Sequence, residues 1–298
     1  MDPDTEVECD FPPYIRQYKS GRVERYGSAD PVPAGTDTDG TGVSSRDVVI
    51  DPSTGLWARL YLPPAPSSAG RLGKLPVVVV LVVSPEYRLA PEHPLPTAYD
   101  DSWEAVTWVA SHAAAGEGAG EPWLAEHGDP SRVFLAGASA GANIAHNMAV
   151  RAGAGDGEHG LAGAARVVGL LVVHPFFGGE ARISEAEPED REKAGAFWRF
   201  RCPGTPGLDD PLCNPFSEAA GGSAARIAGD RVLVCVAEKD ALRDRGVWYY
   251  EGLTASGYRG EVALHESMGV GHVFHYADPE CEQARALQAR VLTFLRDQ

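Results

Sequence analysis

Four short, largely apolar runs constrain the fold of this chain more than any other feature. They lie at residues 76–84, 132–138, 167–173 and 231–237. A run without polar alternation suits a strand that is covered on both faces. Segments with apolar residues at helical spacing follow these runs, and one more strand is expected at 261–265. Alternating strands and helices predict an α/β fold with a mostly parallel sheet covered by helices on both faces.

Length and charge narrow the class of protein. With 298 residues, 44% of them hydrophobic, the chain is long enough for one α/β domain with a large core. The formal net charge of −16 argues against nucleic-acid or anionic-membrane binding, because both need clustered Lys and Arg. The longest apolar run, Val77–Val83, is too short for a bilayer, and the acidic first ten residues do not resemble a signal peptide. We expect a cytoplasmic protein with a small-molecule substrate; the sequence leaves the oligomeric state open.

Neither a metal site nor a nucleotide site is indicated. The five cysteines show no CxxC pair and no zinc-ligand spacing, so we expect reduced thiols. The glycine-rich stretch 153–160 lacks the Lys-Ser/Thr of a phosphate-binding loop. The sequence therefore predicts no metal and no cofactor.

The run at 132–138 leads into the pentapeptide Gly137–Gly141, which fits Gly-x-Ser-x-Gly. In this nucleophile elbow, a serine at a strained strand-to-helix turn points its hydroxyl out of the sheet. The helix expected from Ala140 directs its first free N–H groups and its positive dipole end to the same spot, where they stabilise negative charge. Ser139 is therefore the candidate nucleophile, and the Ala140 N–H is a candidate oxyanion-hole donor.

Two later segments supply the partners that a serine nucleophile needs. The hydroxyl requires a histidine base, and the imidazole requires an acid that fixes its orientation. With an elbow of this kind, the three residues occur in the order Ser, acid, His. Asp240 follows the strand expected at 231–237, and His272 lies in the glycine-flanked loop 269–274. The sequence predicts a triad of Ser139, Asp240 and His272.

Alternatives remain for both partners. Asp240 is also a plausible helix N-cap, and Glu238 or Asp244 is an alternative acid. The other histidines are expected elsewhere: His265 in a strand, His275 at the surface or behind the site, and His146 on a helix face that points away from the elbow.

Three further segments are expected around this core. Residues 1–45 form an arm, with a short helix at 14–26, and residues 47–62 form a β-hairpin. The Pro- and Gly-broken insertion 180–229 is long enough for small helices of its own and for a lid function.

Two helix starts are predicted from capping patterns. Thr97 and Asp100 fit a capping box. In the last helix, Asp278 suits the N-cap and Pro279 the first helical position.

Several motifs occur together and in order. They are GASAGANIAH, YRLAPEHPLP followed by AYDD, HPFFGG, AEKDALRDRG and GHVFH. In these motifs, nearly the whole chain resembles the plant carboxylesterase family, in the hormone-sensitive-lipase-like branch of the α/β-hydrolases, to which gibberellin receptors are related. The resemblance implies one α/β-hydrolase domain over 1–298, with Ser139 as nucleophile, Asp240 as acid and His272 as base. It also implies a cap, formed by 1–45 and 180–229, over a pocket for acyl or aromatic esters. Gibberellin receptors lack the catalytic histidine, which His272 supplies here.

One segment departs from the family pattern. Family members carry a His-Gly-Gly-Gly-type loop and a helix between two strands, but here Val80 runs directly into Leu81. Parallel neighbours need a crossover of about a dozen residues or more, so either one strand–helix unit is missing after Val80 or the run is a fusion of two strand halves. That loop supplies oxyanion-hole N–H groups, which leaves Ala140 as the donor that can be named. Losing one such donor costs on the order of a hundredfold in rate.

These observations favour a carboxylic-ester hydrolase that works through an acyl-enzyme. The missing loop favours, as an alternative, a ligand-binding or catalytically impaired relative. A third reading is a dehydratase or lyase that uses the same three residues.

Overall fold

The computed structural model describes residues 2–26, 32–35, 40–64, 74–81, 87–115, 118–155, 161, 163–185 and 191–296. Internal contacts divide the chain into two compact units. The smaller consists of Met1–Arg46 and Arg59–Pro64, and the larger of Asp47–Ala58 and Ala65–Gln298. A single domain with a cap formed by 1–45 and 180–229 stays a prediction.

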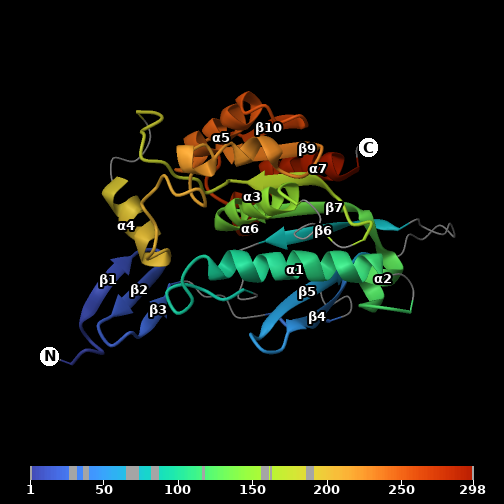
Figure 1. The fold of residues 1–298 in the computed structure, drawn as a ribbon, viewed down its shortest axis with the longest axis horizontal. Helices are drawn as coiled ribbons and strands as arrows, with labels where there is room; N and C mark the ends of the chain where they lie inside the picture. Colours follow the sequence, from blue (N-terminus) through green and yellow to red (C-terminus); the bar gives the residue numbers. More distant parts are fainter. Residues whose placement is uncertain are drawn as a thin grey trace. The chain divides into compact units, whose positions relative to one another are not determined.

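The smaller unit contains a three-stranded antiparallel sheet, drawn in dark blue in Figure 1. Its strands are β1 (Val7–Phe11), β2 (Ile15–Tyr18) and β3 (Val23–Arg25). The helix predicted at 14–26 is therefore wrong. Tight turns, closed by the bonds Tyr14 N–H to Phe11 O (2.9 Å) and Gly21 N–H to Tyr18 O (2.8 Å), reverse the chain before a helix can form.

The larger unit is built on a five-stranded parallel sheet in the order β10-β9-β8-β7-β6. The strands are β6 (Leu75–Leu81), β7 (Gly128–Ala138), β8 (Val167–Val173), β9 (Arg231–Ala237) and β10 (Glu261–Ser267). The register pairs Ala138 with Val173, Val173 with Cys235, and Ala237 with Ser267. The carboxyl ends of four strands therefore meet at one edge, where loop residues collect.

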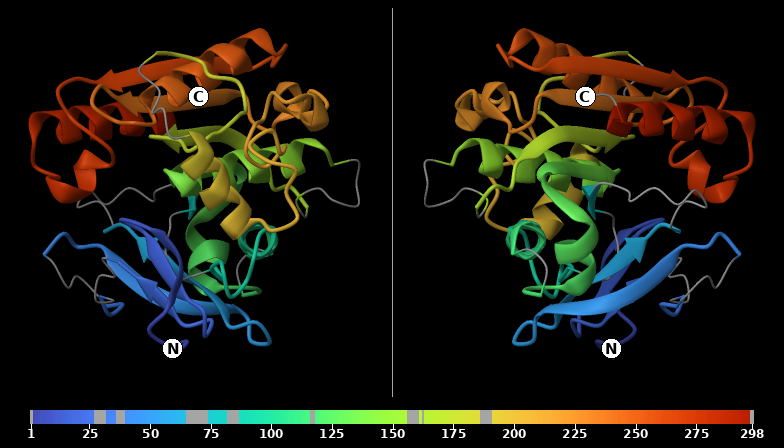
Figure 2. Two further views of the ribbon diagram at one scale, coloured as in Figure 1. Left: turned by 90° about the vertical axis from the view of Figure 1, so that its left-hand side faces the viewer. Right: turned by 90° about the vertical axis from the view of Figure 1, so that its right-hand side faces the viewer.

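Helices cover both faces of this sheet, as predicted. On one face α1 (Thr97–Ala114), α3 (Ala140–Gly153) and α5 (Arg243–Ala255) pack against alternate strand residues such as Leu135 and Val234. On the other face α6 (Phe274–Ala277) and α7 (Glu282–Arg296) pack against the intervening residues, among them Phe134, Leu171 and Leu233 (Figure 2). A short helix, α2 (Pro122–His127), leads into β7.

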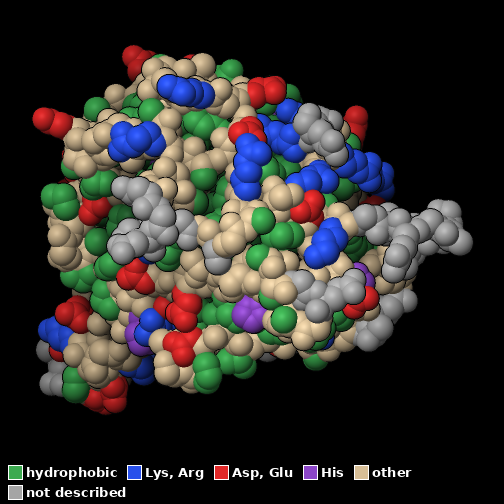
Figure 3. Space-filling model, turned by 45° about the vertical axis from the view of Figure 1, so that its right-hand side comes forward, with side chains coloured by type: hydrophobic (Ala, Val, Ile, Leu, Met, Phe, Trp, Pro, Cys, Tyr) green, Lys and Arg blue, Asp and Glu red, His purple; other side chains and the backbone are tan. Residues whose placement is uncertain are grey.

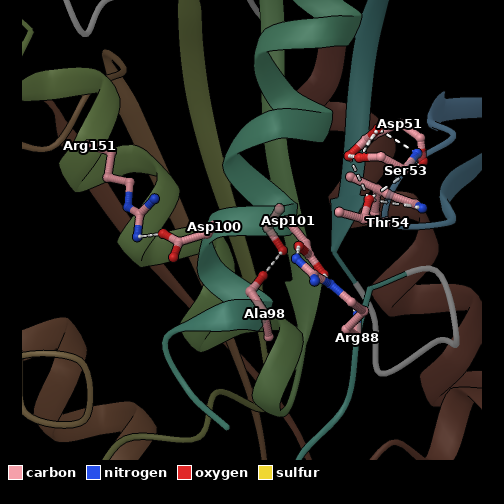
Figure 4. A network of polar contacts seen from close by, with 10 residues as sticks. Asp51, Ser53, Thr54, Arg88, Ala98, Asp100, Asp101 and Arg151 are labelled. Carbon is pink, nitrogen blue, oxygen red and sulfur yellow. Dashed lines mark hydrogen bonds and ion pairs between the residues drawn. The ribbon is translucent and has the colours of Figure 1, made fainter. Parts of the chain in front are cut away.

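The hairpin expected at 47–62 is present as β4 (Ser44–Asp51) and β5 (Leu56–Leu62). The Asp51 carboxylate accepts hydrogen bonds from the Ser53 N–H and from the hydroxyls of Ser53 and Thr54 at 2.8 to 2.9 Å (Figure 4). These bonds keep the pKa of Asp51 below its usual value and hold the turn.

The motif YRLAPEHPLP is tied to α1 by a partly buried ion pair, seen in Figure 4. Asp101 is almost fully buried and accepts from the Arg88 N–H (2.9 Å), Nε (3.0 Å) and Nη2 (2.6 Å). Two nitrogens of the planar guanidinium each donate to one oxygen of the carboxylate. The pair therefore fixes both the position and the orientation of the Arg88 side chain. Arg88 belongs to YRLAPEHPLP, and Asp101 is the last residue of AYDD. The ion pair between them is a physical reason for the two motifs to occur together.

The capping box predicted at Thr97 is wrong. Pro96 occupies the N-cap position of α1, and no side chain caps the helix. The Asp100 carboxylate instead accepts from Arg151 Nη2 at 2.8 Å, across to α3. The ion pair with Arg151 on α3 thus takes the carboxylate that the predicted capping box would use at the start of α1.

The last helix also begins later than predicted. Helix α7 starts at Glu282, so Pro279 is not its first residue. Asp278 follows α6, where its N–H donates to the Phe274 carbonyl at 2.9 Å. The Cys281 sulfur accepts from the Ala284 N–H at 3.4 Å, so a thiol occupies the position expected for a polar cap.

The insertion 180–229 contains the small helices that its length predicts. They are α4 (Arg191–Arg201) and the 3-10 helices η1 (Glu218–Ala220) and η2 (Ser223–Arg226). Trp198 of α4 is buried and stacks on Phe176 with ring centroids 6.2 Å apart. Phe176 follows β8, so the insertion is packed against the edge of the sheet that carries the site.

Strand β6 ends the sheet in the described part of the chain, where β7 is its one neighbour. Val80 of this strand is 55% exposed, unlike the fully buried residues of β7. The predicted loss of a strand–helix unit after Val80 concerns residues 82–86, which lie outside the described residues.

Surface charge is mixed on the face shown in Figure 3, where Lys and Arg side chains gather with Asp and Glu among them. Elsewhere in the described surface, an exposed ion pair joins Arg166 Nη2 to Asp230 Oδ2 at 2.6 Å, with both side chains more than half exposed. Exposed pairs of this kind contribute little to stability. Among the described helices, none combines the length and apolar character that crossing a bilayer requires.

Candidate active site

Ser139 lies at the junction of β7 and α3, as the elbow motif predicts. Its backbone has φ 55° and ψ −119°, a strained conformation for a residue with a side chain. The Ser139 N–H donates to the Val173 carbonyl (2.9 Å), and the Ser139 carbonyl accepts from the Phe176 N–H (3.1 Å). The Ser139 hydroxyl makes no capping bond to α3, so it is available for another partner.

The structure brings the three predicted residues into one hydrogen-bonded chain. His272 Nε2 lies 3.0 Å from Ser139 Oγ, and His272 Nδ1 lies 2.7 Å from Asp240 Oδ2. With the proton on Nδ1, His272 donates to Asp240 and accepts from the serine hydroxyl. The Asp240 side chain is 2% exposed and that of His272 is 33% exposed. A buried carboxylate behind a more exposed imidazole is the arrangement that stabilises an imidazolium.

Asp240 contacts His272 but is not the helix N-cap that the sequence offered as an alternative, because Leu242 occupies the N-cap position of α5 and no side chain caps this helix. Asp240 Oδ2 faces His272, while its Oδ1 accepts from the Leu242 N–H at 2.9 Å and holds the turn before α5. The alternative acids lie elsewhere. Glu238 accepts from the Gly269 N–H at 2.7 Å, and Asp244 pairs with Arg243 Nη1 at 3.0 Å.

The loop that carries His272 is anchored at several points. Besides the bond from Gly269 to Glu238, the Lys239 N–H donates to the Val270 carbonyl at 2.9 Å. Further along, the Val273 N–H donates to His174 Nδ1 at 2.9 Å. The loop is thus bound to the turn after β9 and to the end of β8.

The three histidines that the sequence placed elsewhere lie outside this hydrogen-bonded chain. His146 is buried in α3 beside the Tyr249 hydroxyl (2.9 Å), and burial lowers its pKa to about 3. His265 lies in β10. Its pKa is lowered mainly by burial and to a smaller extent by the positive charge of Arg290. His275 lies in α6 with its ring 5.6 Å from that of His174.

The oxyanion side of Ser139 contains the first turn of α3. In the described structure no acceptor lies within bonding distance of the Ala140 N–H, and the first turn holds no acidic residue. This N–H and the positive end of the α3 dipole are therefore available to a developing negative charge. Further donors from a His-Gly-Gly-Gly-type loop have no counterpart among the described residues.

One group of side chains in the described structure has metal-ligand composition: His174, Asp240 and His272. The donor chemistry does not fit a resident metal. His174 Nδ1 accepts from the Val273 N–H, so the neutral ring carries its proton on Nε2 and has no second lone pair. His272 and Asp240 are bonded to each other through the nitrogen that faces the carboxylate. Nitrogen or oxygen atoms of all three side chains are thus engaged in hydrogen bonds to other protein groups.

His174 is the site residue that sequence reasoning missed. It is 1% exposed, and its pKa is lowered to about 4 by burial above all, with smaller effects of His275 and His272. The signal was its place directly after the strand 167–173, at the start of HPFFGG. Parallel strands bring such positions to one edge.

A cavity of about 310 Å³ lies along the C-terminal half of α5, lined by Phe216, Trp248 and Gly252 among others. None of the three predicted catalytic residues lines it. Asp240 precedes the N-terminus of α5, so this cavity opens toward the far end of that helix.

Comparisons with known proteins agree with the fold. A family described as alpha/beta hydrolase fold matches residues 77–276. A solved esterase from Mycobacterium marinum is similar over 87% of this chain and 83% of its own, with TM-score 0.63 and 24% identity.

Plant proteins are similar over almost the whole chain. A 2-hydroxyisoflavanone dehydratase from Glycyrrhiza echinata is 39% identical and is covered over 96% of its length by 97% of this chain. The protein named probable carboxylesterase 2 from Arabidopsis thaliana is 35% identical, with 97% and 96% covered. Tuliposide A-converting enzyme 1, chloroplastic, from Tulipa gesneriana is 40% identical, with 98% of this chain and 79% of the relative covered.

The first of these alignments spans 324 positions, which is more than the 298 residues of this chain. The relative therefore has segments without a counterpart here. With a matching family over two thirds of its residues and relatives matched almost end to end, the chain belongs to the α/β-hydrolase fold family, in the branch that contains plant carboxylesterases.

Proposed function

We propose that this protein hydrolyses carboxylic esters of small molecules through Ser139, His272 and Asp240. The observation that carries the proposal is the continuous chain of hydrogen bonds from Asp240 through His272 to Ser139. An α/β-hydrolase with esterase relatives supplies the matching context.

The first half-reaction forms an acyl-enzyme. Ser139 Oγ attacks the ester carbonyl carbon while His272 Nε2 takes the hydroxyl proton. Asp240 stabilises the imidazolium, and the carbonyl oxygen, now negatively charged, accepts from the Ala140 N–H. When the tetrahedral intermediate collapses, the bond to the alcohol breaks and His272 gives its proton to the departing oxygen.

The second half-reaction releases the acid. Water enters in place of the alcohol, His272 removes one of its protons, and the resulting hydroxide attacks the acyl carbon. Collapse of the second intermediate returns the proton to Ser139 Oγ. Neither half-reaction calls for a metal or a cofactor.

The proposal is tested with short-chain p-nitrophenyl esters. We expect the purified chain to release p-nitrophenol and the variant S139A to lose on the order of 10⁴-fold or more in kcat. Labelling by an organophosphate, located by mass spectrometry, should occur at Ser139 alone. Unchanged hydrolysis by a folded S139A would reject the assignment.

A second function, elimination of water, is favoured by the relative named as a 2-hydroxyisoflavanone dehydratase. In that reaction His272 would remove a carbon-bound proton, and the adjacent hydroxyl would leave as water. Product analysis separates the two, because incubation with a 2-hydroxyisoflavanone yields an isoflavone in one case and unchanged substrate in the other.

A third possibility, a ligand-binding or impaired relative, is favoured by the shortened sequence after Val80 and by the alignment that exceeds the chain in length. Such a protein would bind ester-like ligands yet resist organophosphate labelling at Ser139. The intact mass of the protein from its native source reports whether the shorter chain is the one made in the cell.

We also propose a cap formed by 1–45 and 180–229 and a location in the cytoplasm. Some relatives carry the words chloroplastic or amyloplastic in their names, so a fluorescent fusion is the direct test of location. Limited proteolysis with and without an ester-like inhibitor tests whether either segment becomes protected when the site is occupied.

A further inference from the structure

His174 occupies an unusual position directly behind the predicted base. It follows β8, is 1% exposed, and has a left-handed backbone with φ 47°. Its N–H donates to the Cys235 carbonyl at 2.7 Å, which ties it to the neighbouring strand β9. Residues with side chains adopt this conformation rarely, and the surrounding structure has to hold them there.

The imidazole of His174 is used to hold the loop of His272. The Val273 N–H donates to His174 Nδ1 at 2.9 Å. Val273 itself has φ 44°, which is an outlier for a β-branched residue. Val273 follows His272 directly in the chain. The hydrogen bond that holds the Val273 backbone therefore also sets the direction in which the His272 side chain leaves the loop.

The surroundings of His174 keep its ring neutral. The rings of His272, Phe274 and His275 lie 5.8, 5.6 and 5.6 Å from it, and Asp240 is the nearby carboxylate. Burial, aided by His275 and His272 and opposed by Asp240, lowers the pKa of His174 to about 4. At neutral pH, Nδ1 therefore has the lone pair that the Val273 N–H needs.

We propose that His174 is a positioning residue, whose Nδ1 fixes Val273 and thereby aims His272 Nε2 at Ser139 Oγ. This inference rests on the proposed function, because it concerns the same base. His174 touches no reacting atom: its effect passes through the loop backbone. Displacement of a catalytic group by about 1 Å can cost a hundredfold in rate, so a fixed loop has a measurable effect.

The test compares two replacements of similar shape. H174N keeps an acceptor on the carbon that carries Nδ1, and asparagine tolerates the left-handed backbone. H174L has the same branching but no acceptor, so the Val273 N–H is left without a partner. We expect H174L to lose about 10- to 100-fold in kcat with KM changed less than twofold, and H174N to stay within about fivefold of the wild type.

Two further readouts separate positioning from a general loss of structure. Active sites are counted with an organophosphate, so that kcat refers to folded, reactive molecules only. In parallel, the Nδ1–H proton resonance of His272, assigned by its absence in H272Q, reports the bond to Asp240. We expect this resonance to be retained in H174N and to broaden or vanish in H174L.

The outcomes are distinct. If H174L matches the wild type in kcat per active site and retains the His272 resonance, the role of His174 is rejected while the esterase proposal stands. If the wild type neither hydrolyses esters nor is labelled at Ser139, the esterase proposal fails. In that case the His272 resonance still decides whether His174 positions the loop.

Discussion

On one side of Ser139 stand a buried carboxylate, an imidazole and a loop anchored to two strands; on the other, in the part of the chain that the structure describes, stands the Ala140 N–H at the start of α3. The Asp240 side chain is 2% exposed, and its two oxygens both accept hydrogen bonds. The described sheet ends at β6, where Val80 is 55% exposed. Different segments of the chain therefore supply the predicted acid and base on one side and the predicted oxyanion donor on the other.

The largest expected effect on the reaction rate concerns the side of Ser139 that carries Asp240 and His272, called the base side below. D240N keeps the acceptor for Leu242 but removes the charge that orients and stabilises protonated His272. We expect kcat for p-nitrophenyl esters to fall by about 10⁴-fold. The matched control E238Q, which alters only the anchor of Gly269, should lose less than about tenfold. A larger loss in E238Q than in D240N would identify Glu238 as the acid.

His174, which lies behind the base, should also make the free energy of unfolding depend on pH. The folded pKa of His174 is about 4, below the value near 6.5 of an unfolded histidine, so the unfolded state binds the proton first. The stabilising contribution is present above about pH 6.5 and is lost as pH falls toward 4. It amounts to roughly 3 kcal/mol.

Urea unfolding at several pH values measures this contribution. The free energy of unfolding of H174N, which has no titrating group at this position, should fall less between pH 6.5 and pH 4 than that of the wild type. Equal slopes in the two proteins would show that His174 is not kept neutral by the fold.

The oxyanion side of Ser139 is tested by adding the loop that the family resemblance predicts. Inserting the His-Gly-Gly-Gly-type segment of a plant carboxylesterase after Val80 should raise kcat/KM by on the order of a hundredfold. A segment of equal length with its glycine loop replaced by serines is the control. Equal activity of both insertions in folded proteins would mean that the loop donors do not limit the rate.

The smallest effect is expected at the sheet edge. V80T should change the free energy of unfolding by less than about 0.5 kcal/mol, because Val80 is 55% exposed. L135A in β7, whose side chain is fully buried, should cost about 2 to 5 kcal/mol. Chemical denaturation checks both, and a large effect of V80T would show that the edge is covered in solution.

Local patterns predicted the core of this molecule well. The strands 167–173 and 231–237 are confirmed to the residue, and α3 begins at Ala140 as predicted. Short apolar runs without polar alternation leave little choice of structure, because a strand covered on both faces buries them. The helix expected at 14–26 was wrong, since two tight turns outweighed its helical pattern.

Sequence by itself determined the candidate residues and their order along the chain: a serine at an elbow, then an acid after a strand, then a histidine in a glycine-flanked loop. Only the tertiary structure decided which acid faces His272 and brought His174 into contact with the loop that carries His272. Residues 174, 240 and 272 are distant in the chain, and no local pattern encodes a 2.7 Å bond between two of them. Their meeting depends on the register of parallel strands, which is set by packing on both faces of the sheet.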